Sequence, residues 1–212
     1  MTNEEILRIA MQQSAADLDC KSEDFLKKEN IIAISKKNNK ARKYLDLPFD
    51  CNLVSYGNNI VASVREDIAE VVKRYIEQYP VERCFETPNL NVLSNDLARD
   101  DLKICFMAEY FLPDLTLLKK QECRYETRIL TNKDFVDLYK LEWSNALCEK
   151  RKECDVLGVG AYDNGKLIGL AACSADCDDM WQIGGGYIAR ISPSRYCLRS
   201  YIHACFDDIN ER

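Results

Sequence analysis

Two cysteines near the C-terminal end of the sequence have a spacing that occurs in metal sites. Cys173 and Cys177 form a Cys-x₃-Cys pair. A structural zinc ion needs four protein ligands, of which cysteine and histidine are the usual ones. The only histidine of the chain is His203, and no further cluster of ligands accompanies the pair. We therefore expect free thiols and no metal site.

Three carboxylates in the same half of the chain have the chemistry of a general base. Glu126, Glu142 and Asp176 could accept the proton of an amine that attacks an acyl group. None of them lies in a motif that fixes such a role, and most Asp and Glu side chains are simply exposed to solvent. The sequence therefore assigns no catalytic residue.

The run Gly184-Gly185-Gly186 could bind phosphate, because consecutive backbone amides can converge on an anion. The residues that follow the run show neither helical nor strand periodicity. This favours a flexible tail over a phosphate site, but both interpretations remain open at this point.

Composition excludes several classes of protein. The 212 residues are 47% hydrophobic and 30% charged, which is typical of one large or two small globular domains. A net charge of −6 disfavours nucleic acid and anionic membranes as partners and suits a cationic amine. Eleven irregularly spaced cysteines, a polar start after Met1 and the lack of a long apolar run predict a cytoplasmic protein with free thiols.

The first 120 residues predict a small α/β unit. The expected elements are a helix over 4–13, a hairpin of strands 52–56 and 60–64, a helix over 66–79 that Pro80 ends, a helix that begins with Thr87 as N-cap and Pro88, and a strand over 103–110. In the Thr87 helix, Leu90, Leu93 and Leu97 are the expected buried residues. A polar, Lys-rich connection at 113–121 is the expected boundary.

Residues 121–184 predict a second unit. A strand over 125–130 precedes a helix that Thr131 or Asn132 caps, with Phe135, Leu138 and Tyr139 on its apolar side. A short helical stretch over 143–150 follows, and then strands over 156–162, 166–174 and 180–183. Asn164-Gly165 joins the first two of these as a hairpin.

This order of elements resembles the front half of the GNAT superfamily of N-acetyltransferases. The most similar pieces are the hairpin Val159 to Ala171 and Met180-Trp181-Gln182-Ile183-Gly184. The resemblance implies an α/β fold with a mixed, largely antiparallel sheet and flanking helices. It further implies acetyl-CoA as cofactor, a small-molecule or peptide amine as substrate, and pairing of the pantetheine arm with Trp181, Gln182, Ile183 and Gly184.

The superfamily's pyrophosphate loop, Arg or Gln-x-x-Gly-x-Gly or Ala, should follow this strand, but its spacing is absent. Codons permitted by Ile191 to Tyr201, read one base late, encode Tyr-Arg-Arg-Gln-Gly-Ile-Ala, which contains Arg-x-x-Gly-x-Ala. The sequence therefore predicts a frameshift near Gly185, an aberrant tail over 185–212, and a GNAT-like sheet truncated after Met180–Ile183.

Without the pyrophosphate loop, acetyl-CoA should bind weakly or not at all. An uncovered strand edge should favour a homo-oligomer. The alternative function is a non-catalytic α/β module for binding or dimerisation.

Overall fold

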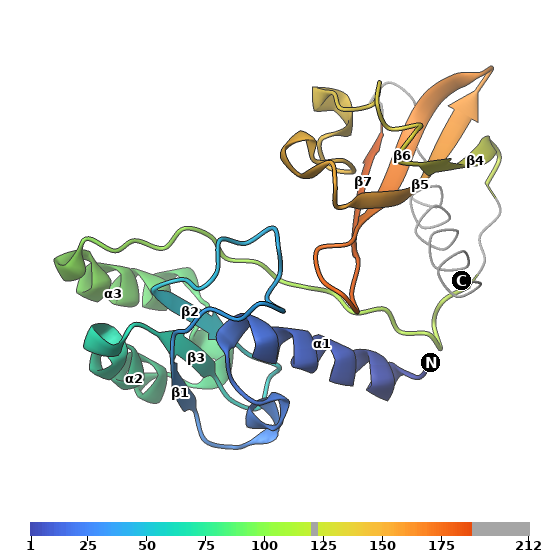
Figure 1. Cartoon of the computed structure of the whole chain (residues 1–212). Helices are drawn as coiled ribbons and strands as arrows, with labels where there is room; N and C mark the ends of the chain where they lie inside the picture. Colours follow the sequence, from blue (N-terminus) through green and yellow to red (C-terminus); the bar gives the residue numbers. More distant parts are fainter. Residues whose placement is uncertain (120–122, 188–212) are drawn as a thin grey trace. The chain divides into compact units, whose positions relative to one another are not determined.

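The computed structural model describes residues 1–119 and 123–187 (Figure 1). Within them the chain is a mixed α/β protein with three α-helices and two sheets, most of whose strand pairs are antiparallel. It divides between Pro113 and Asp114 into two compact units, which we call unit 1 and unit 2.

The helices of unit 1 lie where the sequence predicts them. Helix α1 spans Asn3–Leu18 and begins with a capping box between Thr2 and Glu5, so it is longer than the predicted helix. Helix α2 spans Ala69–Gln78, after a short 3₁₀ turn. Helix α3 spans Thr87–Leu97. The predicted cap of α3 is wrong, because Glu86 holds the N-cap position and Thr87 is already helical.

The sheet of unit 1 lies between two layers of helix. Its strands are β1 (Ile31–Ile34), β2 (Cys51–Val54) and β3 (Val61–Val64), in the order β1-β3-β2. Strand β3 pairs in parallel with β1 and antiparallel with β2, which confirms the predicted hairpin. The side chains of α2 and α3 cover one face of β3, and those of α1 cover the other (Figure 1). Strand β3 is therefore buried on both faces.

The predicted strand over 103–110 is absent. Residues 102–114 contain no helix, strand or turn, and nearly all of their side chains are exposed. Apolar composition was the sole basis of this prediction. The described sheet of unit 1 ends at β1 and β2, and neither of these edge strands pairs with this segment.

Unit 2 is built on a four-stranded antiparallel sheet whose strands follow one another in chain order. They are β4 (Glu126–Thr131), β5 (Asp155–Asp163), β6 (Lys166–Ser174) and β7 (Gln182–Tyr187). The turn between β5 and β6 is formed by Asn164 and Gly165, with φ of 48° and 79°. Positive φ at both residues is the geometry that joins twisted hairpin strands, and it confirms the predicted hairpin.

The helix predicted after β4 is wrong. Residues 132–140 form successive turns, and two short 3₁₀ helices follow, Leu141–Trp143 and Glu149–Arg151. Polar side chains compete here with helical backbone bonds. The Asp134 carboxylate accepts from the Thr131 N–H at 2.8 Å, and the Asn132 amide donates to the Asp155 carbonyl at 2.7 Å. Phe135 is still fully buried, as predicted.

Strand β7 extends beyond the predicted end of its strand at Ile183. Gly185 and Gly186, which the sequence places in the tail, pair with Ala171 and Leu170 of β6. The sequence proposed to be out of frame from Ile188 to Arg212 lies outside the described residues.

Candidate functional site

The residues predicted to pair with a cofactor lie at the start of β7. Gln182, Ile183 and Gly184 are in the strand and pair with Ser174, Cys173 and Ala172 of β6. Trp181 precedes the strand and is 37% exposed. Strand β7 is the last strand of the described sheet, so within that sheet its second edge has no neighbour. The structure thus places three of the four predicted residues on one edge strand and Trp181 immediately before it.

Residues 132–151, which we call the covering segment, lie over one face of this sheet, and that face carries four glycines. Gly158 and Gly160 on β5 and Gly184 and Gly186 on β7 share the face that Phe135 and Trp143 cover. A Cβ atom built at Gly184 would lie 2.1 Å from the Asn145 carbonyl oxygen. The glycine run therefore admits the backbone of 142–146 directly onto β7.

This packing overturns the flexible-tail interpretation for Gly184, Gly185 and Gly186. The phosphate interpretation is also wrong for the described conformation, because a nest requires successive amides that point to one side. In a strand, successive N–H groups point to opposite edges, and half of these face β6. Glycine here serves close packing.

Replacement of Gly184 by alanine should destabilise unit 2 by about 1–3 kcal/mol, because the added methyl group overlaps the Asn145 carbonyl. Gly186→Ala is the matched control, since its Cβ would lie 3.2 Å from the Glu142 carbonyl oxygen and requires a smaller shift. Both tryptophans, Trp143 and Trp181, lie in unit 2, so urea unfolding followed by tryptophan fluorescence reports on this unit. Equal stability of the two variants would contradict the packing.

The three predicted carboxylates do not come together as one site. Asp176 is 3% exposed, and its Oδ1 atom accepts from Arg151 Nη1 at 2.9 Å and from the Ser174 hydroxyl at 3.1 Å. Glu126 is exposed and ion-paired with Arg128 at 2.7 Å. Glu142 is exposed as well. Two of the three lie near β7: Ser174, which donates to Asp176, pairs with Gln182, and the Glu142 backbone lies against Gly186.

A fourth carboxylate, Asp155, was missed by the sequence analysis. It is 1% exposed at the start of β5 and pairs with Ser174, so Asp155, Ser174 and Gln182 form one row across the sheet. Its Oδ2 atom accepts from the Cys148 N–H at 3.1 Å. Burial raises the pKa of the Asp155 carboxyl, and hydrogen bonds from Cys148, Tyr139 and Ser174 partly oppose this. Asp155 therefore keeps its proton to a higher pH than an ordinary aspartate.

Asp155 and Asp176 hold the covering segment against this end of the sheet. Both carboxylates bind groups of the covering segment, the Cys148 amide and the Arg151 guanidinium. The Asp176 Oδ2 atom is buried and has no hydrogen-bond partner among the described residues. The Oδ1 atom accepts from both Arg151 and Ser174, so Asp176 joins the covering segment to β6.

The Cys173–Cys177 pair is accompanied by no metal site in the part of the chain that the structure describes. No group of three or more His, Cys, Asp or Glu side chains there could hold a metal ion. The nine described cysteines are not joined in disulfides. Cys177 Sγ lies 3.3 Å from the Met180 carbonyl, which closes the loop before β7.

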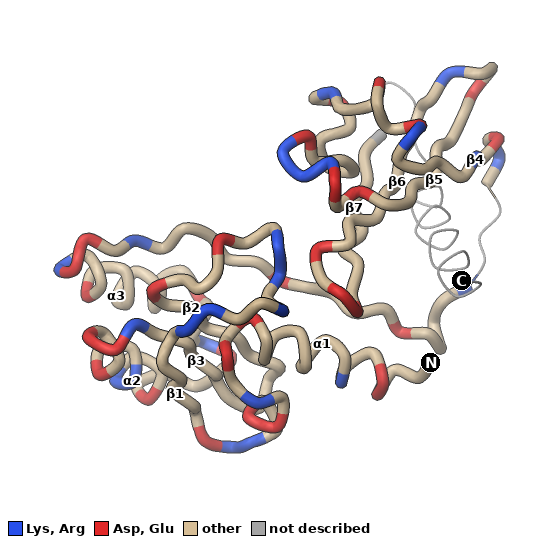
Figure 2. The backbone as a smooth tube through the Cα atoms, in the orientation of Figure 1, with Lys and Arg blue, Asp and Glu red and all other residues tan. Residues whose placement is uncertain are grey.

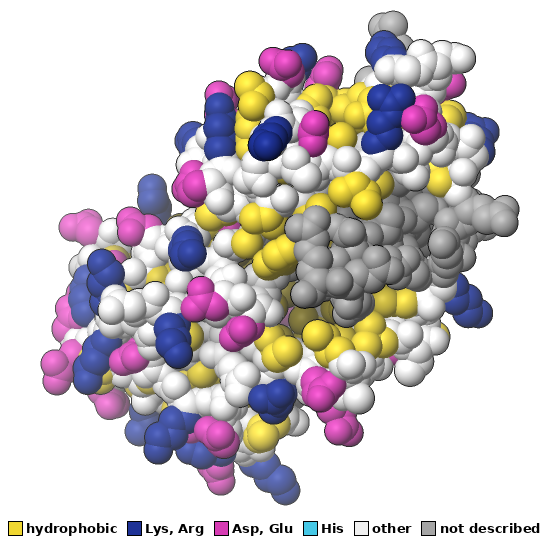
Figure 3. Space-filling view, turned by 45° about the vertical axis from the view of Figure 1, so that its right-hand side comes forward, with side chains coloured by type: hydrophobic (Ala, Val, Ile, Leu, Met, Phe, Trp, Pro, Cys, Tyr) yellow, Lys and Arg dark blue, Asp and Glu magenta, His cyan; other side chains and the backbone are white. Residues whose placement is uncertain are grey.

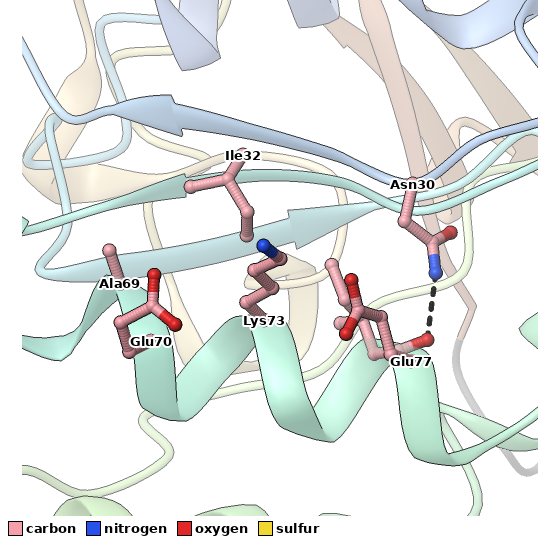
Figure 4. A pocket seen from close by; sticks show the side chains of 7 residues that line it. Asn30, Ile32, Ala69, Glu70, Lys73 and Glu77 are labelled. Carbon is pink, nitrogen blue, oxygen red and sulfur yellow. Dashed lines mark hydrogen bonds between the residues drawn. The ribbon is translucent and has the colours of Figure 1, made fainter.

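A groove of about 280 Å³ lies in unit 1, between β1 and α2 (Figure 4). Glu70, Lys73 and Glu77 line it from one face of α2, and the Asn30 amide donates to the Ile76 carbonyl beside it. It is smaller than most ligand pockets, and its lining combines both charges. It has no feature of an active site.

Charged side chains of both signs are mixed along the described backbone (Figure 2). Both units carry Lys and Arg as well as Asp and Glu, and residues 36–43 of unit 1 form a basic run without an acid. None of the described helices has the length and apolar character needed to cross a membrane.

The comparisons with known proteins identify no relative. No family model matches the chain, and neither the curated proteins nor the solved structures contain a significant match. The chain is a mixed α/β protein whose second unit contains an antiparallel sheet with four glycines on one face. Membership of the GNAT superfamily stays a prediction.

Proposed function

We propose that the chain is a relative of the acetyl-CoA-dependent N-acetyltransferases in which cofactor binding is impaired. The observation that supports this is the antiparallel order β4-β5-β6-β7, with the Asn164-Gly165 hairpin followed by an edge strand that carries Gln182 to Gly184. In the superfamily, as the resemblance implies, such a strand pairs with the pantetheine arm. The acceptor would be an amine, small or in a peptide, which the net charge of −6 suits when it is cationic.

The impairment follows from the conformation of the glycine run. Pyrophosphate binding needs several amides at one helix N-terminus. Gly184, Gly185 and Gly186 instead pair with β6 along an extended strand. Each charge-assisted hydrogen bond contributes roughly 1.5–3 kcal/mol, and about 1.4 kcal/mol corresponds to a tenfold change in affinity. Loss of two or three such bonds weakens acetyl-CoA binding by several powers of ten.

The alternative is a non-catalytic α/β module for binding or dimerisation. One observation favours it: Asp176, whose hydrogen-bond partner Ser174 pairs with Gln182 of β7, is buried in an ion pair with Arg151. A general base must reach the amine that it deprotonates. In the described conformation Asp176 is held by Arg151 and Ser174, Glu126 is ion-paired with Arg128, and Glu142 is exposed.

Calorimetric titration with acetyl-CoA tests the proposal on two proteins. The first is the chain as it stands, for which we expect weak or undetectable binding. The second comes from a gene with one base removed at the Gly184 to Gly186 codons, so that translation continues in the frame that encodes Arg-x-x-Gly-x-Ala. We expect this protein to bind tightly, because the loop amides are restored.

Two outcomes would contradict the proposal in different ways. Micromolar affinity of the unaltered chain would show that it holds the phosphates by another route, and the impairment would be wrong. Lack of binding by a folded frame-corrected protein would remove the family assignment and favour the non-catalytic module.

A further inference from the structure

The segment from Lys103 to Leu112 presents an apolar strip on unit 1. Six of its large hydrophobic side chains are exposed, from 37% at Leu112 to 87% at Phe111, and the others are Ile104, Phe106, Met107 and Tyr110. Hydrophobic side chains gather on part of the face in Figure 3. Contiguous apolar surface of this kind marks interaction sites in globular proteins. The strip therefore has the character of a binding surface.

The backbone of the same segment makes no hydrogen bond to the backbone of another described residue. Among the described residues, the Leu102 N–H donates to the Leu97 carbonyl, and the next backbone hydrogen bond along the chain joins Leu117 to Asp114. None involves 103–112. Unpaired N–H and C=O groups along a segment without helix or turn are a template for strand pairing with another chain.

Contacts with unit 1 hold the strip in place. The Phe106 ring packs edge-on against Phe49, with centroids 5.7 Å apart. Four residues later, Tyr110 lies under the Arg42 guanidinium, 4.9 Å from its ring centroid, and its hydroxyl bonds to that of Tyr44. Anchored at two points, the segment is presented in an ordered form, which lowers the entropic cost of binding.

We propose that this segment pairs antiparallel with the same segment of a second copy of the chain. The charges of Lys103 and Glu109 favour a second copy as the partner and antiparallel as the direction of pairing. Pairing centred on Phe106 places Lys103 of each copy opposite Glu109 of the other, and the two Phe106 rings opposite each other. Opposite charges and aromatic pairs directly across two strands are favourable. Parallel pairing in register would place Lys103 opposite Lys103, which is unfavourable.

The resulting interface is self-complementary about a two-fold axis, as homodimer interfaces are. Cys105 of each copy lies opposite Met107 of the other, between the charged pair and the central phenylalanine. This dimer does not depend on acetyl-CoA or on β7, so it is independent of the proposed enzymatic lineage.

Charge reversal tests the pairing on the full chain by sedimentation velocity over a wide range of concentration. Lys103 and Glu109 are both exposed, so their replacement leaves the fold intact. The native chain should dimerise. Lys103→Glu or Glu109→Lys should each raise the dimer dissociation constant at least about tenfold, because two like-charge contacts replace two favourable ones. The double variant Lys103→Glu/Glu109→Lys should restore dimerisation.

Lys37→Glu is the matched control, since it makes the same charge change at an exposed site of unit 1. It should leave the dimer unchanged. A chain that stays monomeric, a single reversal without effect, or a double variant that stays as weak as the single ones would each overturn the proposal.

A disulfide tests the register. Residues directly opposite on antiparallel strands have Cβ atoms close enough for a disulfide. Met107→Cys should therefore give covalent dimers when diamide takes two electrons and two protons from the thiols of Cys105 and the new cysteine. Adding Cys105→Ser should abolish this product. Cross-linking that survives Cys105→Ser would show a different register and overturn the proposed one.

Discussion

Replacement of Asp17 by alanine is expected to lower the free energy of unfolding of unit 1 by about 3–5 kcal/mol. The Asp17 side chain is 5% exposed, and its Oδ2 atom lies 2.7 Å from Nε of Arg42, whose side chain is 13% exposed. Its Oδ1 atom accepts from the Arg42 N–H at 2.8 Å and from the Gln13 amide at 2.9 Å. Removal of the carboxylate leaves a guanidinium with little access to water and without its partner.

Hydrogen exchange of the α1 amides in increasing urea measures this loss within unit 1. Asp17→Asn keeps an acceptor for the Arg42 N–H and should cost less. Asp46→Ala removes an exposed carboxylate from the same loop region and should stay within about 0.5 kcal/mol. If Asp17→Ala destabilised no more than Asp46→Ala, the ion pair would have no part in joining α1 to this loop.

Phe135→Ala should destabilise unit 2 by a similar amount, about 3–5 kcal/mol. The ring is fully buried in the core cluster that includes Trp143 and Leu170. It lies against Gly158 so closely that a Cβ atom there would be 3.0 Å from the ring. The loss combines the transfer of the ring to water with the cavity left between the covering segment and the sheet.

Val136→Ala is the control, because Val136 is the next residue and is 71% exposed. It should change the stability by no more than about 0.5 kcal/mol. Tryptophan fluorescence in urea follows both variants, since both tryptophans lie in unit 2. Equal midpoints for the two variants would show that the segment 132–150 is not held by the Phe135 ring.

Local signals in the sequence predict most of the elements. The hairpin between β5 and β6 is specified by Asn164-Gly165 alone, because these residues adopt positive φ readily. Helix α2 follows from a stripe of apolar side chains and the proline after it, and Ile68, Val72 and Tyr75 of this stripe are buried. Such signals lie within a few residues of the structure that they specify.

The failures have long-range causes. Residues 132–140 have the apolar spacing of a helix, but the glycines that admit a close, irregular cover lie far along the chain, at Gly158 and Gly184. Similarly, 103–110 has strand-like composition but does not pair with either edge strand of the described sheet of unit 1. A pattern that reports only its own segment cannot reveal either condition.

The candidate site likewise combines residues that local sequence signals predict with residues that only long-range contacts bring together. The sequence places Trp181 to Gly184 on a strand, and the structure has Gln182 to Gly184 in β7. It does not identify Asp155, whose burial depends on pairing with Ser174 and on the Cys148 amide. An acid at the head of an apolar run was the available signal. The pairing of Asp176 with Arg151, twenty-five positions apart, had none.

Within each sheet the paired strands lie at different distances along the chain, and this bears on the order in which they assemble. In unit 2 each strand pairs with the one before it, and β5 and β6 are joined by a two-residue turn. Pairing can begin at that turn, whereas β4 must join β5 across residues 132–154. In unit 1, β1 pairs with β3, and β2 lies between them in sequence. Closing such a loop costs entropy before any contact forms, which slows folding. The first strand of the chain is therefore expected to be the last to join its sheet.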